Sequence, residues 1–301
     1  MRRLAPASLV LALGLVVCPP VSAAGKTKAP GAAALLGTLE GWRDGGLLVI
    51  GGVAKGRGWL SGERARDLAR KGDPIAVYDL QAGLIGRARL TSDGKLSPDE
   101  VPSREFVYGG CYDVRLDADL HKQLSNASEW GGNGSTPVGV WHSSSNPEPR
   151  WVKAALLDAK NRAYREIISD WLAAKSVRRA VIAKVVVDQI VRADINGDKR
   201  DEVFLAFRTP EMVFPTGRRS TKTAFSYLVM RYLPKGARRA RTLVLEDWAD
   251  FVHSVIGICD LDRDGRAEVA TTSSGIDVCG TSLHHWVAGR FRKVYGWGAG
   301  V

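Results

Sequence analysis

The chain has 301 residues, of which 45% are hydrophobic, and it carries a formal net charge of +11. This length and apolar content exclude a protein without a hydrophobic core and favour two domains over one. What the charge implies about partners depends on where the mature chain begins.

The first 24 residues are typical of a cleaved signal peptide. Arg2 and Arg3 precede an apolar run over 9–17, and small residues occupy 22–24. Because the apolar run is too short to span a bilayer, we expect no transmembrane segment. The protein is therefore predicted to be secreted or periplasmic, with a flexible mature N-terminus over 25–35.

Cys18 allows a lipoprotein alternative, because an apolar residue lies three places before it. Lipoprotein signals have a small residue directly before the cysteine, and Val17 fits that poorly. Removal of the signal takes away two arginines and leaves a charge of +9. In an exported protein this charge argues against nucleic acid. It favours an anionic envelope polymer, lipid head groups or another envelope protein, or it serves solubility alone.

Short apolar segments separated by glycine fill 36–124, and they have the length and β-branched content of strands. We predict a small β domain there. The next segment, 125–157, is rich in Ser, Asn, Gly and Pro, so we expect it to connect two domains as a long loop.

One amphipathic helix is predicted over 158–178. Its apolar residues recur at helical spacing and share one face: Tyr164, Ile167, Ile168, Trp171 and Leu172. This pattern predicts a helix that packs on the core rather than on a membrane or a partner.

Two similar segments dominate 179–301. "QIVRADINGDKRDEVFLAF" and "SVIGICDLDRDGRAEVATT" align without gaps when Asp194 is placed against Asp260. Each segment predicts a strand, an acidic loop and a second strand. The predicted fold class is therefore mainly β: a small N-terminal β domain, one helix and two C-terminal β repeats.

The acidic loops have the oxygen spacing of a calcium site. Calcium takes about six to eight oxygens, so side chains on alternate residues of a short loop can wrap it. The candidate ligands of the second loop are the side chains of Asp260, Asp262, Asp264 and Glu268 and the carbonyl of Arg266. Those of the first loop are the side chains of Asp194, Asn196, Asp198 and Glu202 and the carbonyl of Arg200. The alternative is two polar β-turns whose Asp and Asn side chains cap their own backbone.

An EF-hand is excluded, because both flanks have the pattern of strands and neither loop has the required Glu at its twelfth position. We expect the second loop to bind calcium more tightly than the first. It has one more carboxylate, and it has Gly265 where the first loop must turn at Lys199.

Both loops resemble the calcium loops of FG-GAP or VCBS-type repeats, the blades of integrin-like β-propellers, whose core is close to D-x-[DN]-x-D-G-x-x-[DE] between strands. The helix followed by two such repeats is similar to a family of uncharacterised secreted bacterial proteins. The resemblance implies propeller-like blades stiffened by Ca2+, with no catalytic residues. Two repeats are too few to close a propeller, and Lys199 stands where the family has glycine. An incomplete ring is expected unless the N-terminal β segments supply diverged blades.

Three cysteines follow the signal peptide, in a compartment that permits disulfides. Cys259 and Cys279 lie in neighbouring apolar runs and are predicted to pair, which leaves Cys111 free. His284 and His285 are predicted to lie on a strand surface rather than to act as an acid–base pair.

Basic residues gather at 218–222 and 235–241, on either side of an apolar run, and this pattern predicts two solvated loops. Motifs for Ser, Cys or zinc-dependent catalysis are absent from the sequence, so no catalytic residue is predicted. The leading hypothesis is a non-enzymatic, calcium-binding module of the bacterial envelope that binds or supports other components. The alternative is a polysaccharide hydrolase whose carboxylates the sequence does not identify.

Overall fold

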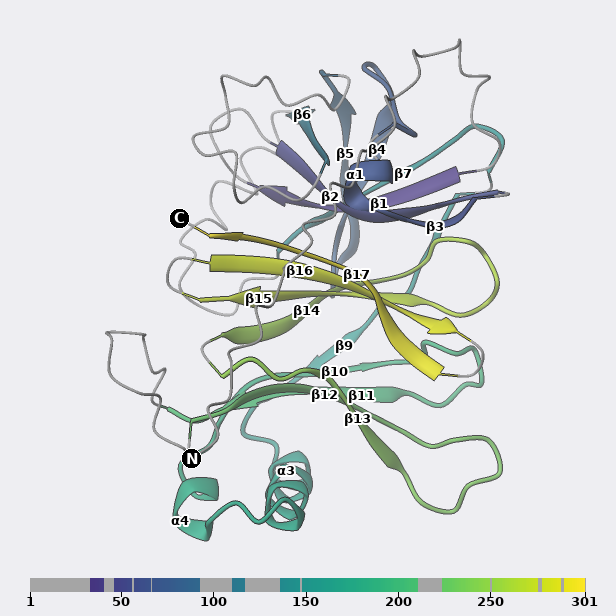
Figure 1. The fold of residues 1–301 in the computed structure, drawn as a ribbon. Coiled ribbons are helices and arrows are strands. Elements are labelled where there is room, and N and C mark those ends of the chain that lie inside the picture. Colours follow the sequence, from purple (N-terminus) through teal and green to yellow (C-terminus); the bar gives the residue numbers. More distant parts are fainter. Residues whose placement is uncertain are drawn as a thin grey trace, which may run out of the picture.

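The computed structural model describes residues 33–40, 46–55, 57–65, 67–92, 110–116, 136–146, 148–210, 224–249, 251–275, 278–287 and 290–300. The signal peptide predicted over 1–24 lies outside these residues, as does the basic cluster at 218–222. The flexible N-terminus predicted over 25–35 is wrong for residues 33–35, which belong to the first strand. Strands form three antiparallel sheets (Figure 1), which confirms a mainly β protein. No helix in this part of the chain is long and apolar enough to cross a membrane.

The N-terminal sheet has seven strands. They are β1 (Ala33–Glu40), β2 (Gly46–Ala54), β3 (Gly58–Ser61), β4 (Pro74–Asp79), β5 (Gly83–Leu90), β6 (Gly110–Leu116) and β7 (Val138–His142). Their order is β1-β7-β4-β5-β6-β2-β3, and β1 also pairs with β2. One edge of β2 is shared, because residues 46–49 pair with β6 and residues 51–54 pair with β3.

Each C-terminal repeat forms a four-stranded antiparallel meander. The first contains β10 (Val186–Ala193), β11 (Glu202–Arg208), β12 (Ser226–Tyr232) and β13 (Arg241–Glu246). The second contains β14 (Val252–Asp260), β15 (Glu268–Ser274), β16 (Val278–Val287) and β17 (Arg290–Gly300). Strands β11 and β15 begin and end at equivalent positions of the two aligned segments. The predicted repeat of strand, loop and strand is therefore present in the fold.

The segment predicted as a long connecting loop contributes a strand to every sheet. Strand β7 lies inside the N-terminal sheet, between β1 and β4. Strand β8 (Arg150–Trp151) then pairs with β14, and β9 (Ala155–Leu157) pairs with β10. Its polar composition hides short runs such as "VGVWH", which are apolar enough to enter a sheet. The prediction of a loop over 125–157 is wrong for these runs.

The helices within the described residues are α1 (Gly62–Ala65), α3 (Arg162–Ala174) and α4 (Arg179–Ile182). Helix α3 is the amphipathic helix expected from the sequence. Ile168 and Leu172 are buried, and the other three residues of the predicted stripe are partly buried beside them. The apolar face packs on β10–β12, which confirms its assignment to the core.

The sheets are stacked in layers, with the second repeat in the middle (Figure 1). One core cluster joins the N-terminal sheet to β14–β16 through residues such as Leu36, Val140 and Ile256. A second cluster, around Phe204 and Val269, fills the space between the two repeats. A third lies between the first repeat and α3. The N-terminal sheet and the helix thus cover the outer faces of a two-repeat stack, as capping units do in repeat proteins.

A side chain of the first repeat also hydrogen-bonds the backbone of the second. The Gln189 amide donates to the Val255 carbonyl at 3.0 Å, and the Val255 N–H donates to Gln189 Oε1 at 2.8 Å. The two residues are separated by the same interval that aligns Asp194 with Asp260. Equivalent points of the two repeats are therefore joined directly.

The predicted Cys259–Cys279 disulfide is wrong. Cys259 is a buried free cysteine, and it lies opposite Glu268, at the start of β15. Cys279 lies opposite Ser274, at the far end of the same strand. The length of β15 between these points is about 20 Å, far beyond the reach of a disulfide. The prediction placed both cysteines in adjacent strands but could not know the register. The Cys111 side chain lies outside the described residues.

Candidate metal centre in the acidic loops

Each acidic loop closes a β-hairpin and is held by bonds from its own carboxylates. In the second loop, the Gly265 N–H donates to Asp260 Oδ2 at 3.1 Å, and the Arg266 N–H donates to Asp264 Oδ1 at 2.8 Å. The first loop has the same two bonds at its equivalent positions. Both loops therefore fold by the local capping that acidic turns use, and this backbone is common to them.

The left-handed positions of the two loops are also equivalent, but glycine fills a different one in each. In the first loop Gly197 has a φ of 75° and Lys199 a φ of 67°. In the second loop Arg263 has a φ of 63° and Gly265 a φ of 87°. Each loop thus has one glycine and one side chain in the left-handed region. The expectation that only the first loop turns with a Cβ is wrong.

A buried glutamate at the start of the second strand anchors each loop. Glu202 Oε2 accepts the Ile195 N–H at 3.0 Å, and Glu268 Oε2 accepts the Leu261 N–H at 2.8 Å. Both glutamates are shielded almost completely from solvent. The anchor fixes the loop to the hairpin and leaves the second oxygen, Oε1, for another partner.

The two loops differ in the hydrogen-bond partner of the glutamate Oε1. In the first loop the Asn196 amide donates to Glu202 Oε1 at 2.7 Å. The second loop has Asp262 at the equivalent position, and an ionised carboxylate has no hydrogen to donate. Glu268 Oε1 is instead hydrogen-bonded to His285 Nδ1, at 2.6 Å, from strand β16.

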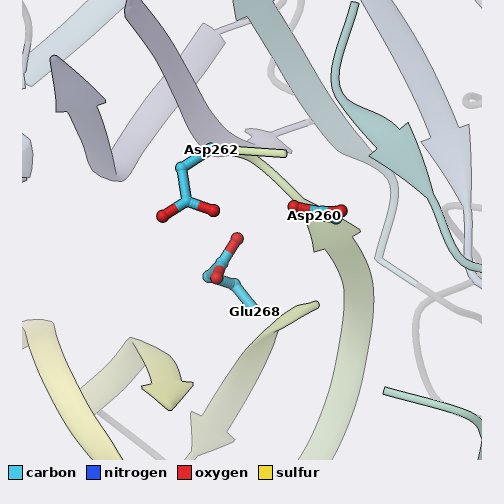
Figure 2. Close-up of side chains that lie close together, drawn as sticks. All are labelled: Asp260, Asp262 and Glu268. Carbon is cyan, nitrogen blue, oxygen red and sulfur yellow. The ribbon is translucent and has the colours of Figure 1, made fainter. Parts of the chain in front are cut away.

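Asp262 consequently adds a third carboxylate to a shared space. Ligand atoms of Asp260, Asp262 and Glu268 all lie within 4.8 Å of one another. Figure 2 shows the three carboxylates turned toward one another, from the end of β14, the loop and the start of β15. Asp260 and Glu268 are buried, and Asp260 Oδ1 has no hydrogen-bond partner among the described residues. A buried carboxylate oxygen without a partner is costly, so this atom is suited to a cation.

The electrostatics of the cluster follow from burial. Burial raises the pKa of both Asp260 and Asp262, and it raises the pKa of Glu268 to about 7, although the His285 bond acts in the opposite direction. Burial also raises the pKa of Glu202 in the first loop to about 7. A cation among the three carboxylates of the second loop would favour their ionised forms and would displace protons on binding.

His285 connects this cluster to the N-terminal sheet. Its ring lies 4.5 Å from the ring of Trp59, centroid to centroid, and Trp59 belongs to β3. Adjacent residues of a strand face opposite sides, and the neighbouring His284 therefore faces the first repeat. The predicted exposed strand surface at these histidines is wrong, because both are buried.

On the side facing the first repeat, His284 belongs to a separate buried network. Its Nε2 lies 3.2 Å from Glu246 Oε1, and Lys293 Nζ donates to Glu246 Oε2 at 3.1 Å. Burial opposes ionisation of Glu246, but the bonds from His284 and Lys293 outweigh it and lower the pKa to about 2. This network ties β13 to β16 and β17 and does not contact the acidic cluster.

The structure therefore brings together only part of the predicted ligand set. The Asp264 side chain is exposed, and its Oδ1 accepts the Arg266 N–H within the loop. The carbonyls of Arg200 and Arg266 stay predicted ligands. In the first loop, Asp194 and Asp198 cap backbone N–H groups, and its described carboxylates form no group comparable to the second. The sequence missed His285 because its contact with Glu268 arises from the β15–β16 register rather than from a local pattern.

The cluster in the second loop can hold a metal ion. It offers only carboxylate oxygens, including the buried and unpartnered Asp260 Oδ1, and hard cations prefer such ligands. Comparison of the chain with protein-family models, with curated proteins and with solved structures finds no match.

Proposed function

We propose that this chain is an exported, non-enzymatic calcium-binding protein with two β repeats of the FG-GAP or VCBS type. The observation that carries the proposal is the group formed by Asp260, Asp262 and Glu268, which contains the buried and unpartnered Asp260 Oδ1. The backbone bonds that the two loops share at equivalent positions support the repeat assignment.

Calcium is favoured over other metals by ligand chemistry. Zinc and other transition metals favour imidazole or thiolate ligands. The nearest imidazole, His285, already binds Glu268, and the Cys259 thiol resists ionisation because burial raises its pKa. Magnesium demands a stricter octahedral geometry than a loop of this kind provides. Calcium tolerates irregular sets of oxygens and accepts water for those that the protein does not supply.

The role of the ion would be structural. It would join the end of β14 to the start of β15 and neutralise three carboxylates that otherwise repel one another. Through Glu268 and His285 the same ion would support the contact with Trp59, and so the docking of the N-terminal sheet. A stack stiffened in this way suits a module that holds an anionic envelope polymer or another envelope protein.

The hydrolase alternative gains no support from the described cavities. Asp188, in a cavity that Leu157 and Ile256 also line, is ion-paired with Arg208 at 3.1 Å. Asp73, in the cavity of the N-terminal sheet, accepts the Trp141 indole N–H at 2.9 Å. Each cavity also has a second carboxylate, Asp158 in the first and Glu148 in the second. Asp158 Oδ1 accepts the Lys160 N–H at 2.8 Å, and Glu148 hydrogen-bonds Tyr78. All four carboxylates therefore have protein partners, and neither cavity offers a free pair among the described residues.

The test is a calorimetric titration of metal-free protein with calcium. We expect Asp262→Asn to abolish the tightest binding event, because it converts the second loop to the chemistry of the first. Asp170→Asn, on the exposed face of α3, is the matched control and should bind calcium as the wild type does. Unchanged calcium binding in Asp262→Asn would contradict the proposal.

A further inference from the structure

A basic pocket lies where the two loops approach the β12–β13 hairpin. Its volume is about 570 Å³, and its lining includes Arg200, Lys235, Arg241 and Arg266. The volume is in the range of pockets that hold small ligands. The acidic cluster lies elsewhere, since neither Asp260, Asp262 nor Glu268 lines this space.

The repeat itself builds two of the four cations into the pocket. Arg200 and Arg266 occupy the same position of the two loops, and both residues line the cavity. The loops are held together by a bond from the Ala267 N–H to the Ile195 carbonyl, at 2.7 Å. Gly197 is also close to the Gly265 carbonyl, where an added Cβ would lie only 3.1 Å away. Equivalent arginines therefore reach one cavity because the loops touch.

The described residues do not neutralise the charge of the pocket. Arg200, Lys235, Arg241 and Arg266 form no ion pair with a described residue. Asp198 is the one carboxylate among the lining residues, and its Oδ1 accepts the Arg200 N–H at 2.9 Å. Four cations against one carboxylate repel one another, and a bound anion would relieve that repulsion.

Two aromatic residues complete the lining. Tyr232 and Trp286 meet edge to face, with ring centroids 5.9 Å apart, and both are partly buried. Their rings give the cavity an apolar wall beside its cations. This combination suits a ligand that has a ring with C–H groups on its face and carboxylates at its edge.

We propose that the basic pocket binds the uronic acid units of an acidic polysaccharide. The inference deepens the proposed function, because it names the place where the module would hold an anionic envelope polymer. Arg and Lys would pair with the sugar carboxylates, and the aromatic wall would contact the pyranose ring. Single-stranded nucleic acid also combines charge with stacking, but its sites use successive rings for successive bases. Here the two rings pack edge to face, so they do not present parallel faces to successive bases.

The binding experiment uses a trimer of galacturonic acid, titrated into the whole protein by calorimetry. Binding should persist in EDTA, because the proposed contacts come from side chains rather than from calcium, and it should weaken as salt rises. Three probes separate the other sources of negative charge: inorganic phosphate, vesicles of phosphatidylglycerol and phosphatidylcholine, and oligothymidylate. A neutral galactose trimer should not bind. Tighter binding of phosphate, vesicles or oligothymidylate than of the acidic trimer would overturn the proposal.

The hairpin supplies a matched pair of variants. Lys235→Gln with Arg241→Gln removes two cations that line the pocket and should weaken trimer binding about tenfold or more. Arg238→Gln with Arg239→Gln removes the same charge from the same turn, outside the lining, and should bind as the wild type does. Equal losses in both double variants would show a general charge effect and refute the pocket.

Calcium titration of the same variants keeps this proposal separate from the proposed function. Lys235→Gln with Arg241→Gln should bind calcium normally, and Asp262→Asn should bind the trimer in EDTA. Absence of trimer binding in a wild-type protein that binds calcium would refute the pocket alone. Trimer binding by a wild-type protein that takes up no calcium would refute only the metal centre.

Discussion

The two acidic loops have one backbone and two chemistries. Both cap themselves with the same bonds, both turn through two left-handed residues, and both are anchored by a buried glutamate. In the first loop Asn196 satisfies that glutamate, so the loop is complete without a ligand. In the second, Asp262 cannot do so; His285 takes its place, and a carboxylate oxygen of Asp260 is left without a partner. The repeat supplies a common backbone, and the loops differ in two contacts: the partner of the glutamate Oε1, and the partner of the first aspartate Oδ1, which accepts the Gly197 N–H in the first loop and is unpartnered in the second.

The largest effect is expected from removing the two donors that satisfy the glutamates. His285→Ala should lower the free energy of unfolding in EDTA by about 3 kcal/mol. The substitution leaves a cavity where the buried imidazole was, and it leaves Glu268 Oε1 buried without a hydrogen-bond partner. Asn196 is the corresponding donor in the first loop and is partly exposed, so Asn196→Ala should lower the free energy of unfolding by only about 1 kcal/mol. Urea denaturation of both variants measures the difference. Equal losses would show that the two donors are equivalent and that the comparison is wrong.

A single substitution, Asn196→Asp, gives the first loop the same carboxylates as the second at these positions. Asn196→Asp should create a new calcium site around Asp194 and Glu202. At a calcium concentration of about 100 times the new Kd, the variant should gain about 2.7 kcal/mol of stability over its own calcium-free form. Thermal unfolding with and without calcium measures the gain against wild type. If Asn196→Asp takes up no additional calcium, the loop backbone and its three carboxylates are not enough to form a calcium site. His285 would then have to be counted as part of the site in the second loop.

Local features of these loops were predictable, and long-range ones were not. The repeat and its alternate carboxylates are written within short continuous stretches, so the hairpins and the candidate ligands followed from sequence. The link between Glu268, His285 and Trp59 joins three strands from two sheets, and only the register brings it together. The same ignorance of register produced the wrong Cys259–Cys279 disulfide.

The amphipathic helix was predictable from its own sequence, whereas the strands of the connecting segment were not. All the apolar residues that define the amphipathic pattern of α3 lie within the helix itself. Strands β8 and β9 are very short, and they exist because β14 and β10 offer them edges to pair with. A polar segment with brief apolar runs gives no local sign of such pairing. The basic pocket was hidden for a similar reason, because its cations come from two loops and a hairpin.

The stability of the calcium-free protein should depend on pH through the two buried glutamates that anchor the loops. The pKa values of Glu202 and Glu268 are raised to about 7 in the folded chain, against an ordinary value of 4.5. The folded state therefore holds more protons than the unfolded state between these values. The stability contribution is fully present below about pH 4.5 and is lost as pH rises through about 7, by at most about 3 kcal/mol for each glutamate.

Urea denaturation in EDTA between about pH 5 and 8 measures this slope. Glu202→Gln and Glu268→Gln should each flatten it, because glutamine does not ionise. Calcium should remove the contribution of Glu268 and leave that of Glu202, since only the second loop has the acidic cluster among the described residues. A slope that calcium suppresses equally in Glu202→Gln and Glu268→Gln would mean that both loops bind the ion.

The smallest effect concerns the backbone and tests whether charge alone separates the loops. Lys199 and Arg263 both occupy left-handed positions with a Cβ, at φ values of 67° and 63°. Lys199→Gly and Arg263→Gly should each relieve strain, and the greater freedom of glycine in the unfolded chain offsets part of the gain. Each variant should therefore become more stable by no more than about 1 kcal/mol, and by similar amounts. Equal gains in urea denaturation would leave the extra carboxylate, rather than the turn, as the reason for the tighter calcium binding that we propose for the second loop. A gain confined to Lys199→Gly would restore backbone strain as a difference between the loops.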